Sequence, residues 1–149
     1  MIIRIFENES VQCELDDTLP VLRHRWKKEP TAEVFKNNLL KIRDAYNELK
    51  HSYANLAWLA DTTLLGELDE ETEKWLVHVW EHLLFENAGL KIHAVILGSN
   101  IFADYPMEQF KADSEQKFEK FNVHLGVFSH EQDAYRWIRE QQVLIKADR

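Results

Sequence analysis

The sequence predicts one α/β domain, in which a mixed β-sheet of about five to six strands packs against four or more helices. Strand-like and helix-like segments alternate in the later part of the chain, which is typical of parallel strands joined by right-handed crossovers. The first 26 residues instead hold short apolar segments separated by polar turns, which favours antiparallel strands. The length of 149 residues fits a single domain that covers positions 1–149.

Three antiparallel strands are predicted at the start of the chain. Residues 2–6 are apolar and mostly β-branched, and residues 11–15 alternate between apolar and polar side chains. Residues 19–26 form the third strand, after a second polar turn. Because side chains alternate along a strand, one face of this third strand carries Leu22, His24 and Trp26.

A helix is predicted from Thr31 to about Lys50. Thr31 is suited to the N-cap position, and Glu33 lies near the positive end of the helix dipole. Apolar residues recur every three or four positions and predict the buried face, which consists of Phe35, Leu39, Ile42, Tyr46 and Leu49. The apolar segment 56–60 follows without alternation, which indicates a strand covered on both faces.

A second helix is predicted between Asp69 as its N-cap and Gly89 as its C-cap. Its expected buried stripe consists of Leu76, Val79, Trp80 and Leu83. A strand over residues 92–97 follows, and Pro106 opens the longer part of a helical region.

The last two elements are a strand over residues 123–128 and a helix. Ser129 and Gln132 match a capping box, so the helix is expected to start there. Its inward residues are expected to be Ala134, Trp137 and Ile138.

Composition and charge narrow the class of partner. A net charge of −8 disfavours nucleic acid as a partner, and no apolar segment approaches the roughly 20 residues that a membrane span needs. Cys13 is the single cysteine and lies in a predicted strand, so we expect a buried free thiol. The first residues lack the charged lead of a secretory signal, so we expect a cytoplasmic protein, and no cofactor is expected.

One segment matches a metal motif. His78-Val79-Trp80-Glu81-His82 fits the H-x-x-E-H pattern of a class of zinc proteases. On a helix, His78 and His82 could reach one metal ion while Glu81 activates its water. Val79 and Trp80 belong to the apolar stripe, however, and no third ligand is evident. We therefore expect a solvated helix face, with His78 and His82 as the metal candidates that remain.

Asp61-Thr62-Thr63 is the main candidate site. It directly follows the buried strand 56–60, and ligands of open α/β sheets gather outside the carboxyl ends of the strands. The segment offers one carboxylate and two hydroxyls that can accept a phosphate. A purely structural turn, in which Asp61 or Thr62 bonds to the backbone, is the alternative. Ser99 follows the next strand and is a second candidate, for binding an anion.

Four segments carry a family resemblance in their order and spacing. They are Trp26…Pro30-Thr31…Phe35, Leu59-Ala60-Asp61-Thr62, Glu73-Lys74-Trp75-Leu76 and Ala88-Gly89-Leu90-Lys91. This pattern resembles the STAS-like (SpoIIAA-like) proteins, especially small bacterial members from Bacteroidetes, over residues 2 to 140. The resemblance implies a mixed-sheet α/β fold and a relation in shape to the CRAL-TRIO lipid-transfer domains.

The resemblance also bears on the candidate loop. Anti-sigma-factor antagonists of the wider STAS group have a D-S-S-G-L-G-like segment in which one phosphorylated serine blocks partner binding. Asp61-Thr62-Thr63 places an acid and two hydroxyls in register with that segment. The resemblance therefore implies a phosphorylation switch at Thr62 or Thr63.

Three functions remain open from the sequence. The favoured one is a non-enzymatic regulatory or protein-interaction domain, switched at Asp61-Thr62-Thr63, with a protein partner or a second copy of the chain. The alternative is a domain that binds a small apolar ligand or lipid, because five Trp and eight Phe can line a pocket. A metal-dependent or Asp61-centred enzyme is the function that the residues favour least.

Overall fold

The computed structural model describes residues 1–98 and 107–147. Its centre is a six-stranded sheet whose strands lie in the order of the sequence, from β1 to β6. The strands are β1 (Ile2–Glu7), β2 (Val11–Asp16), β3 (Val21–Trp26), β4 (Ala57–Asp61), β5 (Ile92–Ile96) and β6 (His124–Phe128). The first three are antiparallel and the rest run parallel to β3, so the predicted mixed sheet is confirmed.

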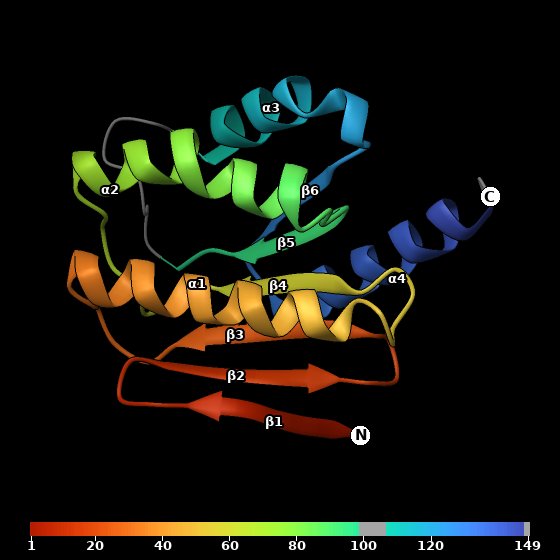
Figure 1. Cartoon of the computed structure of the whole chain (residues 1–149), viewed down its shortest axis with the longest axis horizontal. Helices are drawn as coiled ribbons and strands as arrows, with labels where there is room; N and C mark the ends of the chain where they lie inside the picture. The colour runs from red at the N-terminus through yellow and green to blue at the C-terminus, as the bar shows by residue number, and fades with distance from the viewer. Residues whose placement is uncertain (99–106, 148–149) are drawn as a thin grey trace.

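Helices cover the sheet unevenly. They are α1 (Ala32–Leu49), α2 (Glu70–Trp75) with its π-helical continuations η1 (Leu76–Trp80) and η2 (His82–Asn87), α3 (Met107–Lys117), the 3₁₀ turn η3 (Glu119–Phe121) and α4 (Glu131–Ala147). Figure 1 shows α1, α2 and α3 on the near face of the sheet and α4 behind it. This is the arrangement that right-handed crossovers between consecutive parallel strands produce.

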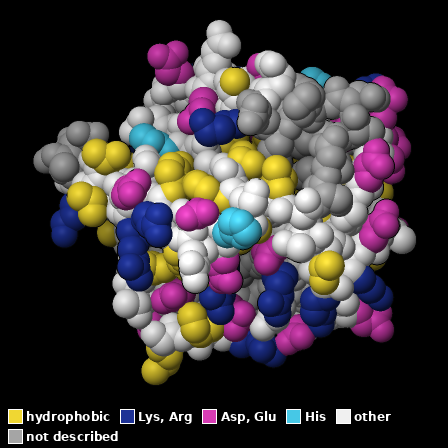
Figure 2. All heavy atoms as spheres, turned by 180° about the vertical axis from the view of Figure 1, so that it is seen from behind, with side chains coloured by type: hydrophobic (Ala, Val, Ile, Leu, Met, Phe, Trp, Pro, Cys, Tyr) yellow, Lys and Arg dark blue, Asp and Glu magenta, His cyan; other side chains and the backbone are white. Residues whose placement is uncertain are grey.

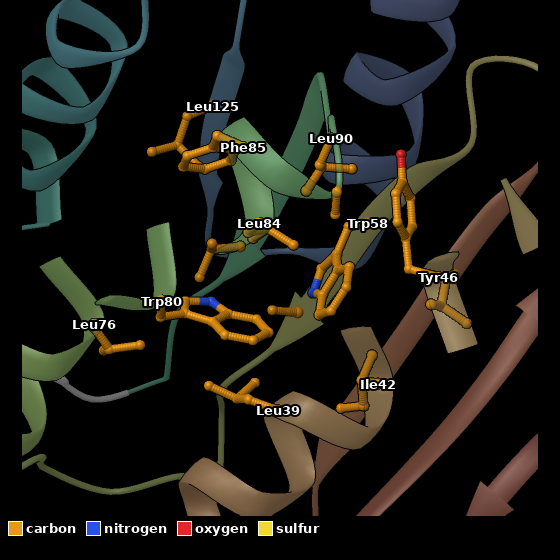
Figure 3. Packing of buried hydrophobic residues seen from close by; sticks show 14 of the residues in the cluster. Leu39, Ile42, Tyr46, Trp58, Leu76, Trp80, Leu84, Phe85, Leu90 and Leu125 are labelled. Carbon is orange, nitrogen blue, oxygen red and sulfur yellow. The ribbon is translucent and has the colours of Figure 1, made fainter. Parts of the chain in front are cut away.

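The larger core lies between the sheet and the three near-face helices. Trp58 of β4 and Trp80 of η1 meet edge to face, with ring centroids 5.8 Å apart. Figure 3 shows these two rings beside each other, with Leu39 and Ile42 of α1 packed against them. A smaller core on the other face joins α4 to β4 and β5 through residues such as Ile138.

The helix ends follow the predicted caps. The Thr31 hydroxyl accepts a hydrogen bond from the Val34 N–H at 3.2 Å, and the Asp69 carboxylate accepts one from the Thr72 N–H at 2.7 Å. Gly89 has a φ of +75°, the left-handed conformation that ends many helices. All three caps were predicted from the sequence. The fourth predicted cap was Ser129, but α4 begins at Glu131, one residue later than a cap at Ser129 would place it.

The buried stripe predicted for the second helix is wrong at Val79, whose side chain is 43% exposed. The Glu81 N–H donates to the Leu76 carbonyl, and the Ala88 N–H donates to the Leu83 carbonyl. Each of these π-type bonds spans five residues instead of four, so the buried face rotates along the helix. As a result Val79 turns outward while Glu81 turns inward.

The face of β1–β3 that points away from α1–α3 carries charged side chains. Figure 2 views the molecule from this side and shows basic and acidic side chains mixed over the lower part, where β1–β3 lie. Cys13 points the other way, into the core, as predicted, and burial raises the pKa of its thiol to about 12. Within residues 1–98 and 107–147, no helix has the length and apolar character needed to cross a bilayer.

Candidate functional site

The loop after β4 is a hydrogen-bonded turn. The Asp61 carboxylate accepts from the Thr63 N–H at 3.0 Å and from the Thr63 hydroxyl at 2.6 Å. Side-chain bonds of this kind fix a turn locally. Thr63 itself is exposed, so its hydroxyl is open to solvent as well as bonded to Asp61.

Thr62 occupies a different environment from its neighbour. Its side chain is only 5% exposed, and its hydroxyl donates to the Ile96 carbonyl at 2.6 Å. The Thr62 N–H donates to the same carbonyl at 2.9 Å. The hydroxyl of Thr62 therefore ties β4 to β5, and of the two threonines Thr63 is the one that a modifying enzyme can reach.

The loop after β5 packs directly on this turn. A Cβ placed on Gly98 would lie 2.3 Å from the Thr63 carbonyl oxygen, closer than any side chain allows. Only glycine fits at this close approach of two backbones. Ser99, the other predicted candidate of this loop, lies outside the described residues.

A polar groove of about 240 Å³ opens beside Asp61 on the charged face of the sheet. Its guanidinium groups already have partners, since Arg23 donates to Tyr135 at 2.7 Å and Arg25 donates to Gln12 at 2.9 Å. Three carboxylates accompany these two cations in the lining, which consists of Gln12, Glu14, Arg23, His24, Arg25, Leu59, Asp61, Ile96 and Glu131. With three carboxylates against two guanidinium groups, the described lining has a net charge of −1 and does not attract an anion.

The H-x-x-E-H segment does not gather a metal site. His78 is exposed, and His82 contacts Glu86 through its Nδ1 at 3.0 Å. Over the described part of the chain, no three His, Cys, Asp or Glu side chains lie where they could hold one metal ion. The segment lies on a helix as expected, but among the described residues its two histidines do not belong to any group of three potential metal ligands.

Glu81, from the same segment, is buried against α3. Its side chain is 3% exposed, and the Ser114 hydroxyl donates to its Oε1 at 3.1 Å, while Oε2 has no partner. Burial raises the pKa of this carboxyl to about 7. Glu81 is therefore an acid whose charge state changes near neutral pH.

The second cavity lies in the larger core, between the sheet and helices α1–α3. Its volume is about 70 Å³, and its walls are almost entirely apolar. We call it the histidine cavity, and it is lined by His24, Trp26, Phe35, Leu39, Trp58, Ala60, Thr62, Leu65, Leu68, Leu76, Trp80, His93, Val95 and Phe110. Figure 3 shows Trp58, Trp80, Leu39 and Leu76 of this lining converging from the sheet and two helices.

The strand register builds the floor of the histidine cavity. His24 of β3 lies opposite Ala60 of β4, and Ala60 lies opposite Val95 of β5. His93 lies two residues before Val95 on β5, opposite Trp58. Ala60 contributes a small side chain to the same lining.

Both histidines are buried, and one ring nitrogen of each lacks a hydrogen-bond partner. The Nδ1 atoms of His24 and His93 are inaccessible to solvent and unpaired. Burial lowers the pKa of His24 to about 3, with a further contribution from His93, and burial lowers the pKa of His93 to about 4. Both rings are therefore neutral near pH 7, and each can donate one hydrogen bond and accept one.

Unpaired buried polar groups are rare because each costs roughly 1–3 kcal/mol. Packing alone does not require imidazoles here, since Phe or Leu would fill the same space without that cost. Both rings line the cavity, but their Nδ1 atoms have almost no accessible surface, so a molecule in the cavity meets other atoms of the rings.

The sequence offered only part of the signal for this site. His24 falls on the same predicted strand face as Leu22 and Trp26, and His93 lies inside an apolar strand segment. Each is thus recognisable as a histidine at an inward position. Their pairing across β4 depends on the register of three strands, which the sequence does not reveal.

Comparisons of the chain with protein-family models, with curated proteins and with solved structures find no significant match. The resemblance to STAS-like proteins therefore remains a prediction from the residues.

Proposed function

We propose that this chain is a non-enzymatic binding domain that holds a small, mainly apolar molecule in the histidine cavity. The observation that carries the proposal is an apolar, largely aromatic cavity whose lining includes the neutral rings of His24 and His93. Ligand sites are typically apolar concavities with a few placed polar groups, which is the composition of this lining.

The size of the cavity limits the ligand. An engineered apolar cavity of about 150 Å³ is large enough for benzene. The histidine cavity, at about 70 Å³, is smaller. The occupant is therefore a molecule of a few heavy atoms, or the end of a longer one.

A retained ligand is the direct test. Native mass spectrometry of protein purified gently from its own cells should show extra mass that is lost on denaturation. Ala60→Leu places a branched side chain in the cavity and should remove this mass. Thr63→Val changes an exposed residue of the adjoining loop and should leave it. Equal masses for the native and denatured protein, together with no binding of small apolar probes, would refute the proposal.

A regulatory domain switched by phosphorylation is the second candidate, and the observation that favours it is the exposed Thr63 hydroxyl. A phosphate on Thr63 would lie beside the Asp61 carboxylate, so like-charge repulsion would open the turn. Phosphopeptide mapping of protein from its own cells tests this idea. Modification at Thr63 is expected, and its absence under all growth conditions would rule out the switch.

A further inference from the structure

We infer that helix α3 is a pH-dependent cover over the histidine cavity, which a buried hydrogen bond from Ser114 to Glu81 holds closed and which loss of the Glu81 proton releases. Such a cover concerns how the cavity opens rather than what it holds, so it goes beyond the proposed function. Three observations support it together. Helix α3 supplies part of the cavity wall, Glu81 is buried against α3, and the Oε2 atom of Glu81 has no partner.

Helix α3 closes one side of the cavity. Its Phe110 side chain is 7% exposed and lines the cavity together with Leu76 and Trp80 of the neighbouring helix. Figure 1 shows α3 lying alongside that helix, which runs from α2 to η2, on the near face of the sheet. Movement of α3 away from its neighbour would withdraw Phe110 and expose the cavity.

Hydrogen bonds hold α3 to the helix that runs from α2 to η2. The Ser114 hydroxyl is almost inaccessible to solvent and donates to the Oε1 atom of Glu81 at 3.1 Å. The Lys117 ammonium donates to the Val77 carbonyl at 2.9 Å. Of these two bonds, the one to Glu81 involves a group whose charge changes near pH 7.

The ionised form of Glu81 is unfavourable while α3 is docked. Burial raises the pKa of this carboxyl from 4.5 to about 7, although the Ser114 bond, Lys117 and His82 each favour the charged form. Asp113 opposes the charged form as well. Once Glu81 is ionised, its Oε2 is a charged acceptor without a partner, and release of α3 lets water reach it.

The direction of the pH effect follows from the protons bound in the two states. When α3 is released, Glu81 becomes hydrated and its pKa returns toward 4.5. Between pH 4.5 and 7 the closed state therefore holds a proton that the open state lacks, so the open fraction rises with pH and levels off above about 7. The two pKa values give an increase of about twentyfold in the open fraction between pH 5.5 and 7.5.

Hydrogen exchange of the whole chain, followed by NMR, measures this opening without any ligand. Wild type is compared with Glu81→Gln, whose side chain keeps its size but cannot ionise, at pH 5.5 and 7.5. The ratio of the two proteins at each pH cancels the intrinsic effect of pH on exchange. The amides of α4, on the opposite face of the sheet, report how strongly the whole domain resists unfolding. Glu71→Gln is the matched control, because Glu71 is exposed.

We expect the α3 amides to exchange faster than those of α4, so that they report a local opening. Their ratio of wild type to Glu81→Gln should increase by about twentyfold from pH 5.5 to 7.5, and the ratio for Glu71→Gln should stay constant. The indole N–H of Trp58, whose side chain is 1% exposed and lines the cavity, should follow α3.

Ser114→Ala tests the bond from its other end. It should speed exchange in α3, and more so at pH 7.5 than at pH 5.5, because a hydrogen bond to an ionised acceptor is about twice as strong as one to a neutral acceptor. This variant also tests the bond independently if Glu81→Gln does not fold.

Several results would overturn the inference. A pH-independent ratio in α3 would show that its release does not depend on the Glu81 proton, and unchanged exchange in Ser114→Ala would show that the bond does not hold α3. Equal protection of α3 and α4 would mean that α3 opens only when the whole domain unfolds. Exchange of the Trp58 indole at the rate of the α4 amides would show that α3 does not cover the cavity. These outcomes leave the proposed binding function to the test for a retained ligand.

Discussion

Replacing His93 with phenylalanine should change how the stability of the domain depends on pH. The His93 ring packs against Trp58 at 6.3 Å and Phe85 at 6.0 Å, and a phenyl ring can keep both contacts. The substitution removes the unpaired Nδ1. Above about pH 7 we therefore expect the free energy of unfolding to rise by about 1 kcal/mol, the lower end of the cost of an unpaired buried group.

The sign of the pH effect follows from the protons bound by each state. The pKa of His93 is about 4 in the folded chain and 6.5 in the unfolded chain. Between these two values the unfolded chain binds a proton on His93 and the folded chain does not. The wild type thus has its full stability above pH 6.5 and loses it as the pH falls toward 4. One pKa unit corresponds to about 1.4 kcal/mol, which gives a loss of about 2 kcal/mol between pH 6.5 and 5 from this residue. Since Phe does not titrate, the advantage of the variant should grow by that amount.

Urea unfolding followed by tryptophan fluorescence at about pH 7.5, 6.5 and 5 measures the difference between wild type and variant. His51→Phe is the matched control, because the side chain of His51 is exposed and its replacement should have little effect at any of these pH values. A stability difference for His93→Phe that stays constant with pH would show that the fold does not hold this imidazole neutral, and would refute the reasoning.

Three further predictions concern Glu81 and the loops after β4 and β5. Burial raises the pKa of Glu81 to about 7, so relative to Glu81→Gln the wild type should gain up to about 3 kcal/mol as the pH falls from 7 to 4.5; parallel pH profiles of the two proteins would contradict this. Thr62→Val removes the buried hydrogen bond to Ile96 and should lower the free energy of unfolding by about 1 kcal/mol, with a smaller loss for Thr63→Val; the opposite order in urea unfolding would be evidence against it. Gly98→Ala forces a Cβ to within 2.3 Å of the Thr63 carbonyl and should cost about 1–3 kcal/mol, whereas an unchanged melting temperature would rule out this close approach.

Local chemistry made most of the secondary structure predictable. The side-chain oxygens of Thr31 and Asp69 accept hydrogen bonds from the first helical N–H groups, as their positions before helical stripes indicated. The alternation of Leu22, His24 and Trp26 likewise placed these three side chains on one face of β3, and the structure shows that this face is buried in the larger core. Signals of this kind depend on neighbours within one turn or one strand, which the sequence displays directly.

What the sequence did not predict depends on geometry beyond one element. Val79 fits an α-helical stripe, but the π-type bonds after Leu76 rotate it outward and bring Glu81 in. No residue pattern in the segment indicates such a bond. The histidine cavity could not be predicted for the same reason. His24 and His93 are 69 positions apart, and only the register of β3, β4 and β5 brings them to one cavity.

The order of the strands has a consequence for synthesis on the ribosome. Because spatial order repeats sequence order, each strand from β2 to β6 can dock on a neighbour that has already been made, without waiting for a later segment. The exception is the second face of β4 and β5, where Leu59 and Ala94 are covered by α4, which emerges only after all six strands. Between the synthesis of β6 and the docking of α4, the nascent chain therefore exposes the apolar second face of β4 and β5. A chaperone that binds exposed apolar surface would act during this interval.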